Sequence, residues 1–341
     1  MMILGLLPYV AAALLISSTL THAGMVHHYD GTPGSKAHAR NNTAILNAAL
    51  LSLQSGDTLL IPNNNTYWLT GGVFASNLVN VTISLDATLK FLPGRAGWPT
   101  QPCPHDSHQK CVQKAILFTN VDHLTLTSSN VIQGGIVDGG GAPWWGYANY
   151  LLHGEDRPKL FTISNGTNLI VERWHLRQSP YHTFHFDDVR SVIVRYCSVD
   201  NRVNSDDSHT IANLAALNTD GFDVSGKDIH IHDCSVWNQD DCFTIVPTSS
   251  DGINANCTEN ILVENVNASG LGLTVGSIEP TASHACIKNI TFRNAYMHHT
   301  YKGIYVKSAN RAVPPPVSYT AEITNILYVN ITMEEPEQVP I

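Results

Sequence analysis

A strand-like register recurs four times between residues 220 and 307, and it leaves few folds open to this chain. The rows lie 21, 30 and 31 residues apart, and each places apolar residues in the same two columns. The columns hold Phe222, Phe243, Leu273 and Ile304, and Val224, Ile245, Val275 and Val306. Because strand side chains alternate between two faces, both columns face the same side.

A register that returns every 21 to 31 residues is typical of a solenoid with one coil per row. We therefore predict an all-β chain folded as a single parallel β-helix, with neighbouring strands about 4.8 Å apart. A second series of strand runs supports this, at residues 123–126, 168–171, 192–194, 229–231, 261–263, 290–292 and 326–328. Asn or Asp precedes several of these runs and suits the left-handed turns of coil corners. Residues 43–53 have helical apolar spacing and should form an N-terminal capping helix.

The same register gathers three carboxylates. Asp220 and Asp241 occupy the same point of successive rows, just before their strands begin. Asp240 is one residue earlier, so its side chain should lean to a different side. Like charges at short range cost free energy, and a protein that only has to fold gains nothing by collecting them. We therefore interpret Asp220, Asp240 and Asp241 as candidate catalytic residues.

The N-terminus indicates export. Residues 1–23 combine an apolar run with small residues at Thr21 and Ala23, as in a cleaved secretory signal. The run is short for a membrane span of about 20 residues, so we expect no stable membrane anchor. Eight glycosylation sequons begin at Asn41, Asn64, Asn80, Asn165, Asn256, Asn267, Asn289 and Asn330. We expect a secreted glycoprotein whose residues 24–341 form one domain, because no linker-like tract interrupts them.

Charge and cysteine content narrow the options further. A net charge of −9 with 14% charged residues argues against a nucleic-acid partner. Seven cysteines in an exported chain suggest disulfides. Cys103 could pair with Cys111, and Cys242 with Cys257, which would leave Cys286 over. Cys197 and Cys234 occupy matching rows and could either pair or stack inside. No Cys-x-x-Cys or Cys-x-x-His spacing indicates a metal site.

Several motifs now point to one family. The segments Asn218-Thr219-Asp220 and 239–242 (QDDC) resemble the signature of glycoside hydrolase family 28, the polygalacturonases. The Gly-rich segment 134–139 followed by Trp144-Trp145 is similar to an early coil of that family. Residues 157–158, 168–171 and 178–185 are similar to the stretch before its catalytic coils. The likeness runs from about residue 134 to about residue 307, with the motifs in the family's order.

The resemblance implies a right-handed, pectin-lyase-like β-helix that hydrolyses α-1,4 galacturonosyl linkages of pectin with inversion. Asp240 would be the general acid, and Asp220 and Asp241 would activate the water. An inverting glycosidase needs one protonated carboxyl and one carboxylate base, and crowded acids supply both states. The implied partner is a pectic polysaccharide, and we expect a monomer that needs no cofactor or metal.

Two departures from the family pattern affect the expected substrate. Gly270-Leu271-Gly272 stands where the family usually has Gly-His-Gly, and Tyr305-Val306-Lys307 stands where it usually has Arg-Ile-Lys. Lys307 is kept and should bind a substrate carboxylate. Tyr305 cannot form the bidentate clamp of an arginine and could instead stack on a sugar. Leu271 beside the acids should desolvate them and raise the pKa of the acid. Rhamnogalacturonan or xylogalacturonan is therefore an alternative substrate, and endo or exo action stays open.

Three further residues are candidate substrate contacts. Asn218 belongs to the signature motif. Asp223 faces outward by alternation and is either a wall of the groove or a structural residue. His185 aligns with Asp223 one coil earlier, and it contacts either the sugar or a side chain of the neighbouring coil.

Two rival functions remain on sequence grounds. A pectate-lyase-type enzyme would bind Ca²⁺ through the carboxylates and use an arginine base, yet the aligned rows contain no arginine. An unsaturated product would identify the lyase. A non-catalytic carbohydrate-binding solenoid would bind sugar without turnover. The final residues, 339–341, look like the start of another coil, so we expect an incomplete copy of a longer solenoid.

Overall fold

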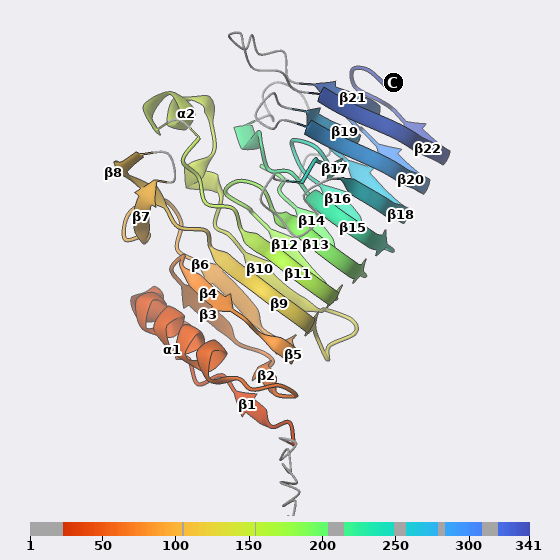
Figure 1. Ribbon diagram of the computed structural model, residues 1–341. Coiled ribbons are helices and arrows are strands. Elements are labelled where there is room, and N and C mark those ends of the chain that lie inside the picture. Colours follow the sequence, from red (N-terminus) through yellow and green to blue (C-terminus); the bar gives the residue numbers. More distant parts are fainter. Residues whose placement is uncertain are drawn as a thin grey trace, which may run out of the picture.

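A computed structural model of the chain describes residues 23–103, 106–153, 155–203, 215–248, 257–278, 284–308 and 320–341. Twenty strands form one continuous sheet in which every pairing between named strands is parallel. The sheet winds into stacked coils that rise from the red N-terminal end to the blue C-terminal end (Figure 1). The predicted parallel β-helix is confirmed. The predicted secretory signal and the sequon at Asn256 lie outside the described residues.

The coils have three faces, each a stack of parallel strands. The first stack comprises β1 (Val26–His28), β2 (Thr58–Ile61), β5 (Val79–Leu85), β9 (Ile116–Thr127), β11 (Phe161–Glu172), β13 (Phe184–Arg195), β15 (Phe222–His232), β18 (Thr258–Ser269), β20 (His284–His298) and β22 (Thr320–Glu334). The second comprises β3 (Thr66–Leu69), β6 (Thr88–Phe91), β10 (Gly135–Asp138), β12 (Trp174–Arg177), β14 (Ser198–Asp200) and β16 (Ser235–Trp237), and continues into the second halves of β18 and β20.

The third stack positions the candidate site. It begins with β4 (Val73–Ser76), runs through the first halves of β9, β11, β13 and β15, and continues as β17 (Phe243–Ile245), β19 (Leu273–Ile278) and β21 (Ile304–Ser308). Outside the coils, β7 (Thr100–Cys103) and β8 (Asp106–Val112) form an antiparallel hairpin. The helices are two 3₁₀ turns (Lys36–His38 and Ala142–Trp144), α1 (Ala39–Ser52) and α2 (Tyr147–His153).

The core consists of apolar columns that run along the solenoid axis. Phe222 pairs with Phe243 in the ladder, and Phe243 pairs with Leu273. The rings of Phe184, Phe222 and Phe243 are stacked, with centroids 4.6 and 5.1 Å apart, and all three are fully buried. The predicted register is therefore confirmed. Val306 at the end of its column is 58% exposed, because no described strand stacks on β21 beyond it.

Asn and Asp residues turn the coils, as the sequence predicts. Asp228, Asn260, Asn289 and Asn325 all have φ between 55° and 59°, in the left-handed region. The side chain of Asn260 donates to Asp228 over 2.9 Å, and that of Asn289 donates to Asn260 over 3.1 Å. These bonds link one corner to the next, so the corners support one another along the solenoid.

The predicted N-terminal helix is present as α1 and starts four residues earlier than its apolar spacing indicated. It packs against β3 and β4 beside the first coils (Figure 1). Its buried Leu46 and Leu50 belong to the same apolar core as the strands, so α1 covers that end of the core. In the part of the chain that the structure describes, no helix has both the length and the apolarity to cross a membrane.

One expected disulfide is confirmed and one is wrong. Cys103 and Cys111 are bonded across the β7–β8 hairpin. Cys257 pairs with Cys286 rather than with Cys242. The reason is register: Thr258 is opposite Ile287, so the residues before them lie side by side in adjacent coils, with Cα atoms 4.5 Å apart.

The remaining described cysteines are buried free thiols, namely Cys197, Cys234 and Cys242. Cys197 and Cys234 stack inside adjacent coils without bonding, which was one of the two options that their matching rows allowed.

Candidate active site

The candidate site lies at one corner of the coils, where each coil enters the third stack. The residue two positions before each strand occupies equivalent places there, and we call this set the corner column. It contains Lys114, Lys159, His182, Asp220, Asp241 and Leu271. The N–H of Thr183 donates to the carbonyl of Asp220, and the N–H of Gly221 donates to that of Asp241, both over 2.8 Å. The column therefore places Asp220 and Asp241 in adjacent coils, as predicted.

The three predicted carboxyl groups converge. One oxygen from each of Asp220, Asp240 and Asp241 lies within 4.8 Å of the others. All three residues are less than 9% exposed, so the cluster is shielded from bulk water. Asp240 reaches the cluster from the position next to the corner column, which agrees with its predicted offset.

Two buried asparagines fix the backbone beneath this cluster. The amide of Asn238 donates to the carbonyls of Thr219 and Asp241, over 3.0 and 2.8 Å. The amide of Asn201 donates to the carbonyl of Thr219 over 3.1 Å. Both asparagines are fully buried and follow paired strands, β14 and β16. Sequence analysis missed them, although their matching position after two aligned strands was a usable signal.

Asp241 is held by donors from later coils. Its Oδ2 lies 3.1 Å from the ammonium of Lys307, and its Oδ1 accepts a hydrogen bond from Thr274 over 3.0 Å. The hydroxyl of Tyr305 also donates to Oδ1. Charge-assisted bonds of this kind are short and strong, so they fix the position of this carboxyl group. The structure thus places the two predicted substrate contacts, Tyr305 and Lys307, on Asp241.

Asp240 has the properties of a proton donor. Burial and the charge of Asp241 raise its pKa to about 6, while Lys307 and two backbone donors oppose the shift. Those donors are the N–H groups of Asn218 and Asp241, each 2.9 Å from one carboxyl oxygen. A carboxyl that is half protonated near pH 6 can still give up its proton in mildly acidic solution.

Charged side chains surround Asp220 and shift its pKa. Burial and the carboxylates of Asp223, Asp240 and Asp241 raise its pKa well above the usual value, and Lys307 opposes this. Its Oδ1 is buried and has no hydrogen-bond partner among the described residues. The cluster therefore shares protons among its members, since like charges so close cannot all ionise.

A histidine that sequence analysis missed lies on the other side of Asp220. The Nδ1 of His182 contacts the carboxylate of Asp223, and its Nε2 lies 3.8 Å from Oδ1 of Asp220. Burial would raise the pKa of Asp223, but His182 and His185 hold it well below its usual value. Extending the register three residues back from His185 would have placed His182 beside Asp220.

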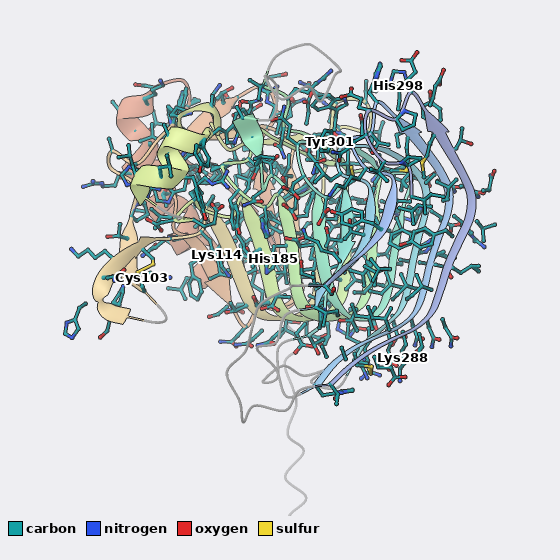
Figure 2. All side chains as sticks on the ribbon, turned by 90° about the horizontal axis from the view of Figure 1, so that it is seen from above. Cys103, Lys114, His185, Lys288, His298 and Tyr301 are labelled. Atoms are coloured by element: carbon teal, nitrogen blue, oxygen red, sulfur yellow. A yellow bond between two sulfur atoms is a disulfide. The ribbon has the colours of Figure 1, made fainter. Side chains whose placement is uncertain are left out.

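The other predicted contacts are distributed around this centre. Asp223 is 3% exposed and its carboxylate contacts His182. His185 lies 3.6 Å from Asp223, and Lys159 contacts its ring nitrogens. Burial lowers the pKa of His185 to about 4, so the ring is neutral at physiological pH. His185 lies on the face of the stacked strands (Figure 2).

A cavity of about 330 Å³ opens beside Asp240. Tyr147 and Tyr150 of α2 line it together with Glu155 and Asn218. The side-chain amide of Asn218 donates to Glu155 over 2.7 Å, so this predicted contact forms part of the cavity wall.

Two clusters at this site have the ligand types that a metal ion uses. One is formed by Asp220, Asp240 and Asp241, and the other by His182, His185 and Asp223. In the first, the ammonium of Lys307 already supplies positive charge to Asp241 at 3.1 Å. The geometry is thus that of carboxyl groups with an internal counter-ion, which suits proton transfer.

Comparison with known proteins identifies a matching family and similar chains. The model of glycosyl hydrolases family 28 matches residues 55–341. A probable endo-xylogalacturonan hydrolase A of Aspergillus niger is 25% identical over 323 residues, covering 89% of this chain and 71% of that protein. A probable endopolygalacturonase D of Emericella nidulans is 26% identical over 223 residues, covering 63% of this chain and 40% of that protein. The chain thus spans less than half the length of this second relative.

Solved structures show the same fold. The endo-xylogalacturonan hydrolase of Aspergillus tubingensis superposes with a TM-score of 0.74 at 22% identity, covering 92% of this chain and 76% of that one. An exopolygalacturonase of Thermotoga maritima superposes with a TM-score of 0.61 at 17% identity, covering 93% of this chain and 78% of that one.

Proposed function

The chain belongs to family 28 of the glycosyl hydrolases, and from this premise we propose that it hydrolyses α-1,4 galacturonosyl linkages of pectin with inversion. The observation that carries the proposal is the convergence of three buried carboxyl groups within 4.8 Å, one of which has a pKa raised to about 6. A buried acid cluster with separated proton affinities is what acid–base cleavage of a glycosidic bond requires.

In the proposed reaction each carboxyl group has a defined role. Asp240 gives its proton to the glycosidic oxygen as the bond from that oxygen to the anomeric carbon breaks. A water molecule held by Asp220 and Asp241 attacks the anomeric carbon from the opposite face. The water's proton passes to this pair, and a proton exchange with solvent returns Asp240 to its acidic form.

The distances set this cluster apart from the two-carboxylate scheme. Inverting enzymes of that scheme keep their carboxyl groups about 6.5–9.5 Å apart, and retaining enzymes about 5–5.5 Å apart. In this cluster, one oxygen from each of the three carboxyl groups lies within 4.8 Å of the others. The anomeric form of the first product therefore needs to be measured directly.

Tyr305 and Lys307 both donate hydrogen bonds to Asp241. Because the Tyr305 hydroxyl bonds to Asp241, we propose that it helps orient this residue as the partner of the water. The side chain of Lys307 is 40% exposed and has three donor hydrogens, so it can contact a substrate carboxylate while it holds Asp241. Asn218, Asp223 and His185 would then shape the groove around the sugar.

A second candidate substrate is xylogalacturonan, and two observations favour it. The cavity beside Asp240 has room for a branch, and its tyrosines offer faces on which a neutral sugar can stack. Relatives named as xylogalacturonan hydrolases match the chain over more of its length than does the Emericella endopolygalacturonase. We also propose that the protein is a secreted, glycosylated monomer without a membrane anchor.

The test is a substrate panel with the purified protein. Homogalacturonan, xylogalacturonan and rhamnogalacturonan are incubated with the wild type and with Asp240→Asn, and new reducing ends and ultraviolet absorbance are recorded. We expect reducing ends without absorbance from the wild type, and at least a hundredfold less from the variant. An absorbing product would identify a lyase instead. Absence of turnover on every polymer would leave only the carbohydrate-binding function.

A further inference from the structure

The corner column carries two lysines on the N-terminal side of the acids. The N–H of Ala115 donates to the carbonyl of Lys159 over 2.9 Å, and that of Leu160 donates to the carbonyl of His182 over 3.0 Å. Lys114, Lys159 and His182 thus belong to successive coils. At about 5 Å per coil, Lys159 lies about 10 Å and Lys114 about 15 Å along the column from Asp220. Lys114 and His185 both lie on the face of the stacked strands (Figure 2).

In the described part of the chain, these two lysines lack the ion pairs that four other lysines have. Lys90, Lys227, Lys288 and Lys307 each lie within 3.3 Å of a carboxylate oxygen. In the described part of the chain, neither Lys114 nor Lys159 has a carboxylate oxygen within 4.0 Å. The Nζ of Lys159 contacts the ring nitrogens of His185, at 3.1 and 3.2 Å.

This arrangement costs folding free energy. Both lysines are half-buried, and burial lowers the pKa of each. Lys159 lowers the pKa of Lys114 further by repulsion, and Asp187 acts in the opposite direction on both. Asp220 and Asp223 also attract Lys159 without pairing with it. Two adjacent ammonium groups that are desolvated and unpaired form a site that an anion would complete.

We propose that Lys159 and Lys114 bind carboxylates of the substrate, two and three coils from Asp220 respectively, and so select a polymer of unesterified uronic acid residues. The proposal rests on the proposed function, because it extends the same groove along the solenoid axis. A net charge of −9 repels such a polymer, so a local pair of cations has a physical purpose. The pair also supplies carboxylate recognition that Tyr305 cannot provide.

The test compares Lys114→Gln, Lys159→Gln and the double variant on homogalacturonan and on its methyl-esterified form. We expect KM for homogalacturonan to rise about tenfold for each lysine removed, with kcat nearly unchanged. The esterified polymer should show little change, so the double variant should lose the preference of the wild type for free acid. Lys288→Gln, on a lysine that Figure 2 places away from this face and that pairs with Glu259, is the matched control.

A binding measurement makes the test independent of turnover. Calorimetry with a long oligogalacturonate is performed on Asp240→Asn and on Asp240→Asn carrying both lysine substitutions, at low and high salt. We expect the lysine substitutions to weaken binding by about a hundredfold at low salt and less at high salt. Unchanged affinity and KM, or an equal loss on the esterified polymer, would overturn the lysine site. Tight, lysine-dependent binding by a wild type without turnover would instead refute only the hydrolase function.

Discussion

Asp240 is the residue on which proton donation depends. Replacing it by Asn removes the proton for the leaving oxygen but leaves the water and its two partners in place. For Asp240→Asn we expect kcat to fall about 10²–10⁴-fold on homogalacturonan. A galacturonide with a nitrophenol leaving group needs little protonation, so its loss should be much smaller. The ratio of the two losses, measured under single-turnover conditions, checks the role. Equal losses would mean that Asp240 has another function.

The raised pKa of Asp240 predicts the pH profile. A general acid must be protonated to act. On the alkaline side of the profile, kcat/KM should therefore fall tenfold per pH unit above about pH 6, and titration of Asp240 should cause no change below that pH. Burial and Asp241 are the causes of the shift, so a variant with less charge beside Asp240 should move this limb to lower pH. A profile whose alkaline limb stays flat through pH 8 would contradict the role given to Asp240.

His182 is expected to act through Asp223. It compensates the charge of Asp223, which in turn opposes ionisation of Asp220. His182→Gln should therefore make Asp220 harder to ionise and move the acidic limb of kcat/KM to higher pH. His175→Gln is the control, because His175 contacts Ser198 of β14 in the second stack. A lower rate with an unmoved acidic limb would indicate that His182 only supports the fold.

At the scale of strands, the phenylalanine column couples stability to the site. Phe222 is fully buried, stacks on two neighbouring rings and lies two residues after Asp220. Phe222→Ala should lower the free energy of unfolding by about 3–5 kcal/mol, because a cavity forms inside the coil. Denaturant unfolding measures this, with Phe74→Ala as the control, since Phe74 is 48% exposed. A loss below about 1 kcal/mol would mean that the column does not support this corner.

The repeating coils of the solenoid determine which features of the fold and of the site can be predicted from the sequence. The alternation of side chains in the strands that contain Phe222 and Phe243 was enough to predict the strand register. That register then placed Asp220 beside Asp241. Contacts that depend on side-chain direction across several coils were not recoverable, such as the Tyr305 hydroxyl on Asp241. The pairing of Cys257 with Cys286 required the register of two other strands, which their own apolar pattern does not specify.

The same strand register also locates the residues of the corner column. Its lysines and histidine precede strands that also begin with buried apolar residues, so the same alignment reaches them. The long segment between β14 and β15 interrupts the repeat spacing, because Phe184 and Phe222 are opposite each other yet 38 residues apart in sequence. Which charged residues lie close together in the groove is therefore determined by how the chain winds into coils, and not by their separation in the sequence.

The most direct test of the catalytic assignment is the anomeric form of the first sugar end released from homogalacturonan. Proton NMR follows the reaction within minutes, before the two anomers equilibrate, using the wild type with Asp240→Asn as the inactive control. Attack by water on the face opposite the leaving group predicts that the β-anomer appears first from these α-linkages. Initial release of the α-anomer, or equal release by the control, would contradict the assignment of Asp220, Asp240 and Asp241 to inverting hydrolysis.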